Sequence, residues 1–363
     1  MIDPLIRDFR IDPYELALSQ VWRSARGRIG QREGEILRLE DEAGGIGIGE
    51  CAPLPEAGTE DPDAARRWLR ERTRTLLGQA VEAGLADVGF SDAVSAVQPT
   101  HPAARCAIET ALLDLKASRA GVPLRSLLAS DAGDEFAVNA SLGALDASIR
   151  DRARTAFSAG FQVLKIKLGV GAPAAEQAAL AELAAGLPAS CRLRLDANGA
   201  WDEEGARGWL AVLRDLPVDC LEEPLRDAAP EQLRALQSAC EFPLAADESL
   251  QSLLISSGPD RLPVRRAVLK PTVLGGAQRT LQLATTLMQH GIECVVTTAL
   301  EAAPGRWLVA QCAAALGNDL SHGLDTGSWL ESDLGPGPPV LAGRCRLPRS
   351  PGLGFDPAQL PGQ

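Results

Sequence analysis

Two lysines, three acids and a further lysine recur at comparable intervals through the second half of this sequence. They are Lys165, Lys167, Asp196, Glu222, Asp247 and Lys270. Three carboxylates from separate segments suit a hard divalent cation that keeps open positions for water and substrate. Mg²⁺ is the natural choice, and Mn²⁺ fits the same ligands. The lysines on either side of the acids would then act as acid–base groups beside the metal.

This combination favours removal of a proton from the carbon next to a carboxylate. Loss of that α-proton produces an enediolate, and a divalent cation stabilises the negative charge where it develops. A lysine can accept the proton only while it is neutral, and a pKa lowered from about 10.4 to near 7–8 is the useful range for this. Lys165 and Lys167 are two residues apart and point to the same side of a strand. We therefore expect Lys165 to lower the pKa of Lys167 by like-charge repulsion. Lys270 would lie across the site, as an opposing acid or base or as a cation beside the intermediate.

The charged residues come at the ends of short apolar segments that have the length of strands. These segments are FAVNASL (136–142), VLKIKLG (163–169), RLRLDAN (192–198), VDCLEEP (218–224), PLAADES (243–249), RAVLKP (266–271), ECVVTTA (293–299) and a weaker eighth, GLDTG (323–327). Ala- and Leu-rich helical stretches lie between them. Strands that alternate with helices form a parallel sheet, and seven or eight such units fit a closed barrel. Barrel enzymes carry their reacting groups at the carboxyl ends of the strands.

Each charged residue also has a structural interpretation. Taken singly, each acid could cap the helix that follows it, and Lys165 and Lys270 could be structural salt-bridge partners of those acids. Buried parallel strands are almost wholly apolar, so five successive charged strand ends favour a metal site. Glu223 and Glu248 follow two of the proposed ligands and point the opposite way. We expect them to support the ligands or to face the helices.

The first third of the sequence lacks this regular alternation of strands and helices. Residues 1 to about 60 read as strands and turns, and residues 61 to about 130 read as helices, starting with the capping pair Asp61-Pro62. The Gly-rich stretch GGIGIG (44–49) does not match a dinucleotide-binding loop, and we interpret its glycines as close backbone packing. The Pro- and Gly-rich tail after residue 328 is expected to pack back on this N-terminal region.

Composition excludes several classes of function. The chain has 363 residues, of which 45% are apolar, so large cores can be buried and disorder is not expected. Its net charge of −12 argues against nucleic acid and membrane partners, but not against a small-molecule carboxylate bound through a metal. The eight cysteines are scattered without zinc spacing and are read as reduced thiols. With no apolar run of membrane-spanning or signal-peptide length, a cytoplasmic location is expected.

Several motifs resemble those of the enolase superfamily, in its muconate-cycloisomerase-like branch. They are KIK (165–167), DANGAW (196–201), EEP (222–224), ADES (246–249) and LKPT (269–272). The resemblance covers nearly the whole chain. It implies an α/β fold, an enolase-type modified (β/α)7β barrel with an α+β N-terminal capping domain completed by the C-terminal tail. The expected divisions are the capping domain at 1–130, the barrel at 131–327 and the C-terminal segment at 328–363.

Within that branch the sequence is most similar to the o-succinylbenzoate synthases. The similar segments are GECAPLPEAGTED (49–61), TTALEAAPG (297–305) and HGLDTGSWLESDL (322–334). The resemblance implies a hydro-lyase that dehydrates 2-succinyl-6-hydroxy-2,4-cyclohexadiene-1-carboxylate to o-succinylbenzoate in menaquinone or phylloquinone biosynthesis. It implies that Lys167 removes the α-proton and then helps the hydroxyl leave from the same face. Lys270 would stabilise the enediolate from the opposite face by cation–π attraction.

The resemblance and the strand pattern together suggest substrate contacts. The candidates are Thr297 and Thr298 near the succinyl group, Asn198 and Arg194 beside the metal ligand Asp196, and Pro53 in a capping loop that closes over the substrate. Arg26 and Arg28 lie near the other expected capping loop, without an assigned contact. Ala303 and Pro304 stand where small polar residues are expected in that family, which is a departure on the substrate side.

Three alternatives remain open. N-succinylamino acid racemases and dipeptide epimerases use the same metal and one lysine on each face of the substrate. Asp325 could meet the amino group of a dipeptide, so the sequence does not exclude an epimerase. A catalytically silent barrel with a structural or binding role would be expected to lack a ligand or a lysine, and here every position is filled. The oligomeric state, monomer or homo-oligomer, is open.

Overall fold

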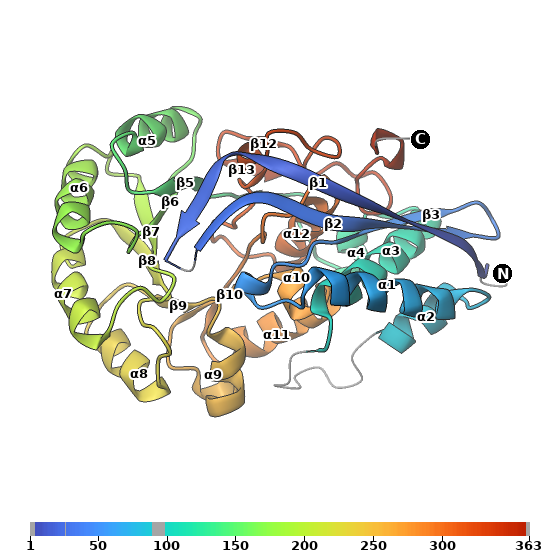
Figure 1. Cartoon of the computed structure of the whole chain (residues 1–363), viewed down its shortest axis with the longest axis horizontal. Helices are drawn as coiled ribbons and strands as arrows, with labels where there is room; N and C mark the ends of the chain where they lie inside the picture. The colour runs from blue at the N-terminus through green and yellow to red at the C-terminus, as the bar shows by residue number, and fades with distance from the viewer. Residues whose placement is uncertain (1–3, 26, 89–98, 361–363) are drawn as a thin grey trace.

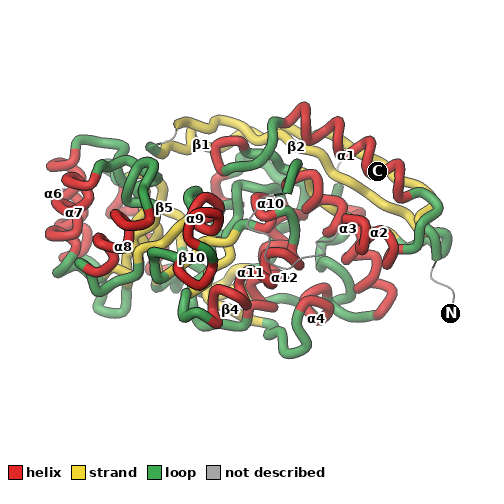
Figure 2. Tube along the Cα trace, turned by 90° about the horizontal axis from the view of Figure 1, so that it is seen from below, coloured by secondary structure: helices red, strands yellow, loops and turns green. Residues whose placement is uncertain are grey.

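The computed structural model describes residues 4–25, 27–88 and 99–360. Figure 1 shows a barrel-like body on which the N-terminal strands and helices rest, with a long β-hairpin reaching across to the barrel strands. The view from below in Figure 2 shows the same hairpin running along one side of the molecule, from the capping helices to the barrel. The hairpin tip is thus brought to the part of the barrel that carries the charged strand ends.

The capping domain is an antiparallel sheet covered by helices. Its sheet has the order β1-β2-β3, and the longest helix, α3, is buried along most of its length. The Asp61 carboxylate accepts hydrogen bonds from the backbone of Asp63 and Ala64 and caps α1, as the sequence predicts. The elements are β1 (Ile6–Ser24), β2 (Gly27–Asp41), β3 (Ile46–Cys51), η1 (Pro55–Ala57), α1 (Pro62–Leu76), α2 (Val81–Val88), α3 (Pro102–Ala120) and α4 (Leu124–Leu128).

The Gly-rich strand β3 packs directly against α3. A Cβ atom added to Gly49 would lie 1.9 Å from the carbonyl oxygen of Ala107, and one added to Gly47 would lie 2.0 Å from that of Ala111. Real Cβ atoms do not approach backbone this closely. The interpretation of this stretch as close backbone packing is therefore confirmed.

Gly49→Ala is expected to destabilise the protein by about 1–3 kcal/mol or more, because the added methyl group overpacks a contact between two backbones. Chemical denaturation monitored by circular dichroism would measure the loss. Gly208→Ala is the matched control, since Gly208 is exposed and a Cβ there meets nothing within 4 Å. An unchanged denaturation midpoint for Gly49→Ala would contradict the packing seen here.

The barrel is a seven-stranded parallel sheet that a short segment closes into a ring. Its strand order is β5-β6-β7-β8-β9-β10-β11. His322 and Gly323 form parallel bridges to Val138 and Thr297, next to the two ends of this sheet. The strands are β5 (Ala140–Ala144), β6 (Val163–Lys167), β7 (Arg192–Asp196), β8 (Val218–Glu222), β9 (Leu244–Ala246), β10 (Arg266–Leu269) and β11 (Glu293–Val296).

Helices follow the barrel strands along the chain. They are α5 (Ile149–Ser158), α6 (Pro173–Ala185), α7 (Glu203–Leu213), α8 (Pro230–Ser238), α9 (Leu250–Ser257), α10 (Pro271–Leu274), α11 (Ala277–Gln289) and α12 (Ala303–Leu316), with short 3-10 turns η2 (Pro259–Arg261) and η3 (Gly327–Trp329). None of the helices in the described part of the chain is both long enough and apolar enough to cross a membrane. The eight cysteines are all free of disulfides.

Two expected strands differ from the structure. The segment 136–142 is not one strand, because β4 (Glu135–Ala137) pairs antiparallel with β13 (Arg344–Arg346) and only β5 enters the barrel. The first part of an extended segment can pair in one sheet and the second part in another while the side chains alternate throughout. The sequence therefore did not reveal this change of sheet. The segment 323–327 is not a strand either, and only its first residue bridges to the sheet.

The C-terminal tail completes the capping domain. Leu330 bridges to Leu18 of β1, and the backbone amide of Leu353 donates to the Asp114 carboxylate of α3 at 2.6 Å. The tail also contains β12 (Val340–Leu341), which joins β13 and β4 in a small sheet, and η4 (Pro357–Gln359). Apolar residues of the tail, of α12 and of the capping sheet share one core. The α/β fold with a barrel and an α+β capping domain completed by the tail is confirmed.

Candidate active site

The register of the barrel strands brings the charged residues together. Lys167 of β6 pairs with Asp196 of β7, which in turn pairs with Glu222 of β8. Asp247 directly follows β9, and Lys270 directly follows β10. All five therefore lie at one end of the parallel sheet, where the strand reading placed them.

The three acids form a compact cluster that fits a divalent cation. Carboxylate oxygens of Asp196, Glu222 and Asp247 lie within 4.8 Å of one another, and the first two side chains are fully buried. Glu222 Oε1 accepts no hydrogen bond from the described residues, and Arg194 Nε lies 3.9 Å away. A buried carboxylate oxygen without a hydrogen bond destabilises the folded protein unless a cation binds it. The all-oxygen donor set is the one that Mg²⁺ and Mn²⁺ prefer.

The lysines contact the same carboxylates from two sides. Lys167 Nζ lies 2.6 Å from Asp196 Oδ2 and donates to Asn198 Oδ1 at 2.8 Å. Lys165 Nζ lies 3.0 Å from the same Asp196 oxygen and also pairs with Glu222. Lys270 Nζ lies 2.7 and 2.8 Å from the two oxygens of Asp247. Lys165 and Lys167 thus share one side of the cluster, and Lys270 comes from a strand four places along the sheet.

Burial and charge compete in setting the protonation of this cluster. Burial alone would lower the pKa of Lys165, but Asp196 and Glu222 raise it by more, so its pKa lies above the usual range. The pKa of Lys270 is raised in the same way, with Asp247 as the main opposing charge. Burial would raise the pKa of Asp196, but Lys165 and Lys167 outweigh it and hold this pKa well below its ordinary value. Glu222 differs, because burial outweighs Lys165 and raises its pKa.

A cavity opens above the cluster, at the junction of the barrel and the capping domain, and its empty space of about 770 Å³ includes the part that is open to solvent. Within the lining that the structure describes, the cations are the three lysines, and the rest divides into hydroxyl, amide, acidic and apolar side chains. The lining residues are Trp22, Ile29, Leu54, Glu56, Ala57, Asn139, Ser141, Lys165, Lys167, Asn198, Asp247, Glu248, Lys270, Thr297, Thr298, Ala299, Leu300, Gly323, Asp325 and Thr326.

Three of the expected substrate contacts line this cavity. Asn198 holds Lys167, as described above. The Thr297 hydroxyl is buried without a hydrogen-bond partner in the described part of the chain. The hydroxyls of Thr298 and Thr326 lie 2.8 Å apart.

The structure places the other two expected contacts outside the lining. Arg194 is fully buried inside the barrel, where it donates to Asp219 at 2.8 Å, to Asn139 at 3.0 Å and to the carbonyl of Ser321 at 2.8 Å. Pro53 lines a neighbouring groove on the capping domain, together with Arg28. Arg26 lies outside the described residues.

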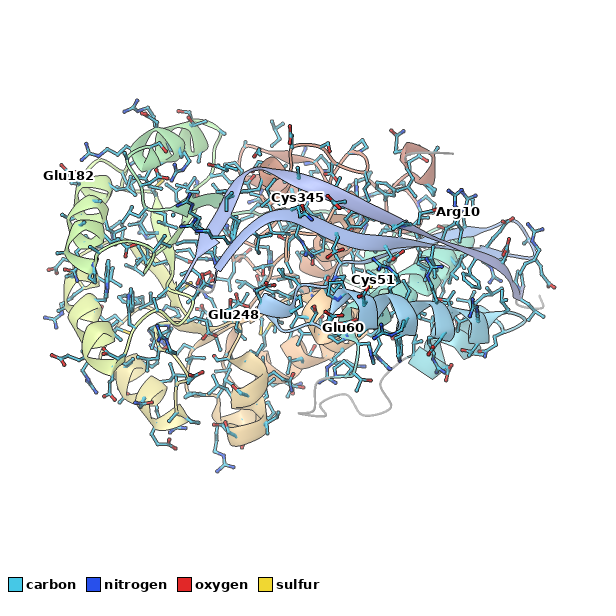
Figure 3. The ribbon with its side chains drawn as sticks, in the orientation of Figure 1. Arg10, Cys51, Glu60, Glu182, Glu248 and Cys345 are labelled. Carbon is cyan, nitrogen blue, oxygen red and sulfur yellow. The ribbon has the colours of Figure 1, made fainter. Side chains whose placement is uncertain are left out.

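The remaining acids take distinct positions. Glu223 Oε1 accepts the backbone amide of Asp247 at 2.6 Å and both the amide and the hydroxyl of Ser249, at 2.8 and 2.7 Å. It therefore supports the Asp247 loop. Glu248 accepts a hydrogen bond from Asn198 Nδ2 at 3.0 Å and lies at the junction of the barrel and the capping domain (Figure 3). Asp325 accepts from the backbone amide of Ser141, and burial raises its pKa to about 6.

Sequence reasoning missed the contribution of the hairpin tip. The Trp22 ring lies at the end of β1 with its centroid 5.5 Å from Lys167 Nζ, a distance that permits a cation–π interaction. The Trp329 ring packs edge-on against Trp22, with centroids 4.6 Å apart. A large aromatic residue near the end of a long predicted strand, beside a turn, is the signal that could have pointed to this contact.

Comparison with known proteins agrees with this geometry. The family described as "Enolase C-terminal domain-like" matches residues 148–359. The o-succinylbenzoate synthase of Thermosynechococcus vestitus is 32% identical over 81% of this chain and 84% of its own. The structure of a dipeptide epimerase from Enterococcus faecalis, complexed with Mg and the dipeptide L-Leu-L-Tyr, superposes with a TM-score of 0.85 at 26% identity, covering 96% of this chain and 99% of that one.

The fold itself is also shared with lactonizing enzymes. A muconate lactonizing enzyme from Pseudomonas fluorescens, complexed with muconolactone, gives a TM-score of 0.88 at 23% identity, over 99% of this chain and 98% of that one. At this identity the likeness concerns the fold alone. The family model matches more than half of the chain, and the o-succinylbenzoate synthase is 32% identical over most of it. The chain therefore belongs to the enolase superfamily, in its muconate-cycloisomerase-like branch.

Proposed function

We propose that this protein is a Mg²⁺-dependent o-succinylbenzoate synthase, which dehydrates 2-succinyl-6-hydroxy-2,4-cyclohexadiene-1-carboxylate to o-succinylbenzoate and water. The observation that carries this proposal is the pair of lysines that contact opposite sides of the carboxylate cluster inside one cavity. The 32% identity to an o-succinylbenzoate synthase supports the choice of substrate. The family resemblance implies the same metal and two lysines for racemases and dipeptide epimerases, so the choice of substrate rests on the cavity wall and on this likeness.

Each residue of the cluster has a role in the proposed reaction. Asp196, Glu222 and Asp247 would hold Mg²⁺ or Mn²⁺, which when bound supplies positive charge to the substrate carboxylate. Lys167, held by Asn198, removes the α-proton and returns it to the departing hydroxyl, so that one water leaves and the ring becomes aromatic. Lys270 stabilises the developing negative charge from the other side.

The far side of the cavity is suited to the succinyl arm. Hydroxyl groups of Thr297, Thr298 and Thr326 line it and can donate hydrogen bonds to a carbonyl or carboxylate oxygen. The Thr297 hydroxyl has no hydrogen-bond partner in the described part of the chain, but its oxygen is buried, so a small side-chain rotation would be needed for it to meet a ligand. Apolar side chains would enclose the carbon skeleton. They come from the hairpin tip (Trp22 and Ile29) and from the loops after β3 and β11 (Leu54 and Leu300).

An assay of the purified protein with the cyclohexadiene substrate tests the proposal directly. With Mg²⁺ present, o-succinylbenzoate is expected to form, with loss of the diene absorbance and appearance of the aromatic product. EDTA should abolish the reaction, and added Mg²⁺ or Mn²⁺ should restore it. Absence of product at saturating substrate and Mg²⁺ would reject the dehydration assignment.

Racemisation or epimerisation is the second candidate, favoured by Asp325 in the cavity lining and by the lysines on two sides. A carboxylate at this position could bind the ammonium group of a dipeptide. In D₂O, an N-succinyl amino acid or a dipeptide would then exchange its α-hydrogen. Exchange without any dehydration would replace the first proposal with this one. A catalytically silent barrel would show neither reaction.

A further inference from the structure

Part of the apolar wall of the cavity comes from two loops in different parts of the fold. Leu54 and Ala57 follow β3 in the capping domain, whereas Ala299 and Leu300 follow β11 in the barrel. Both loops lie outside the sheets, so sheet hydrogen bonds do not fix the distance between them. Other contacts must hold the two sides of the wall at one separation.

The side chain of Arg32 connects the two loops. From β2, its Nε donates to the carbonyl of Leu300 at 3.1 Å, while Nη1 donates to that of Pro53 at 2.9 Å and Nη2 to that of Ala52 at 3.0 Å. The residue is 4% exposed and does not line the cavity itself. A planar guanidinium with a carbonyl on each nitrogen fixes its three partners in one rigid arrangement.

Glu50 ties the same part of the capping domain to the barrel. Its Oε1 accepts the Tyr14 hydroxyl at 2.5 Å and the backbone amide of Ala302 at 2.8 Å, and its Oε2 accepts the amide of Gly305 at 2.7 Å. These two amides lie at the start of α12, where backbone donors lack helical partners. The end of β3 is therefore anchored immediately before the loop that Arg32 holds.

The barrel loop has a backbone conformation that needs such support. Leu300 has a φ of 62°, in the left-handed region that residues other than glycine seldom adopt. Glu301 anchors its surroundings, because its carboxylate accepts the amide of Ala299 at 2.6 Å and the hydroxyl of Thr272 at 2.7 Å. Strained backbone persists only where several contacts hold it. The bond from Arg32 to the Leu300 carbonyl is one of these contacts.

We propose that Arg32 is a positioning residue that sets the separation between Leu54 and Leu300. This separation determines which substrate side arms, such as the unreactive succinyl arm, fit into the cavity. The proposal deepens the proposed function, on which it rests only for the identity of the substrate. Arg32 acts through the carbonyls of two loops and makes no contact with the metal ligands. Its loss should therefore weaken substrate binding much more than the chemical step.

Arg32→Met in the full-length protein tests this role. Amide hydrogen exchange, followed by mass spectrometry, is expected to accelerate in both loops, residues 52–58 and 298–302. KM for the cyclohexadiene substrate should rise by about tenfold or more, because charge-assisted hydrogen bonds are lost, while kcat changes by less than about threefold. Mg²⁺ affinity measured by calorimetry should match that of the unmodified protein.

Two further variants separate this role from a general loss of stability. Arg125→Met removes another buried guanidinium, which bonds to Asp134, Gln311 and the carbonyl of Pro348 outside the cavity lining. It should lower the unfolding midpoint without changing exchange in the two loops or KM. Arg32→Lys keeps the charge but cannot serve three carbonyls as a planar fork. It should fold if the methionine variant does not, and it should still accelerate exchange in both loops.

Unchanged exchange in both loops of an Arg32 variant would overturn the proposal. So would acceleration spread over the whole capping domain, as a purely structural role predicts. The exchange measurement needs no substrate. If the unmodified protein fails to dehydrate the cyclohexadiene, the proposed function falls, while the exchange data still decide the role of Arg32.

Discussion

Lys167→Ala is expected to lower kcat by roughly 10²–10⁴-fold, the usual contribution of a positioned general base. In the structure Lys167 Nζ is held by Asp196 and Asn198 at the floor of the cavity, and no other lysine has these two contacts among the described residues. Lys165 is held between Asp196 and Glu222 and is not placed to replace it. Alanine removes the base and leaves all three carboxylates in place.

Steady-state kinetics and Mg²⁺ titration of the variant should therefore give different answers. The rate of dehydration, and of α-hydrogen exchange in D₂O, should collapse together, while calorimetry still detects Mg²⁺ binding. Lys116→Ala is the control, since Lys116 is a half-exposed lysine paired with Glu82 on the capping domain. Full activity in Lys167→Ala would refute the assignment of the base. Loss of Mg²⁺ binding would show instead that the lysine maintains the metal site.

The sequence predicts the charged cluster well because strand geometry leaves little freedom. In a parallel barrel the strand ends share one edge, so Lys167, Asp196 and Glu222 had to meet once their strands were recognised. Side-chain alternation also predicts that Arg194 points to the same side of its strand as Asp196. Arg194 does so, but it lies deeper in the barrel, below the cavity lining. Its partner Asp219 comes from the next strand along the chain, and the interior depth of a side chain is not visible in alternation.

The cavity wall could not be predicted in the same way, because it depends on segments that meet only in the folded chain. Trp22 reaches Lys167 from a hairpin tip whose position is set by the C-terminal tail, through Trp329. The carbonyl of Leu300 points at Arg32 because its backbone is left-handed, and no residue type at this position signals that conformation. Tertiary contacts of this kind shape the cavity wall, whereas the local strand pattern brings the charged residues together.

Glu222→Gln is expected to abolish both Mg²⁺ binding and activity, although glutamine nearly matches glutamate in shape. The carboxylate is fully buried, and its Oε1 has no hydrogen-bond partner in the described part of the chain. Glutamine would place a neutral amide there and remove one of three anionic ligands. With Mg²⁺ at about 100 times its dissociation constant, the unmodified protein should gain about 2.7 kcal/mol of stability, and the variant should gain none.

The Mg²⁺-dependent change in unfolding midpoint, not the midpoint itself, is the decisive measurement for Glu222→Gln. Burial raises the pKa of Glu222, so its ionised form is disfavoured in the folded protein without metal, and the substitution need not destabilise that state. The substitution also removes the negative charge that pairs with Lys165, and this loss lowers the stability of the folded protein. Glu204→Gln, at an exposed position of α7, should keep the full Mg²⁺ response. An equal Mg²⁺ response in Glu222→Gln would show that the cation binds elsewhere, and the three acids would then be a salt-bridge network with the lysines.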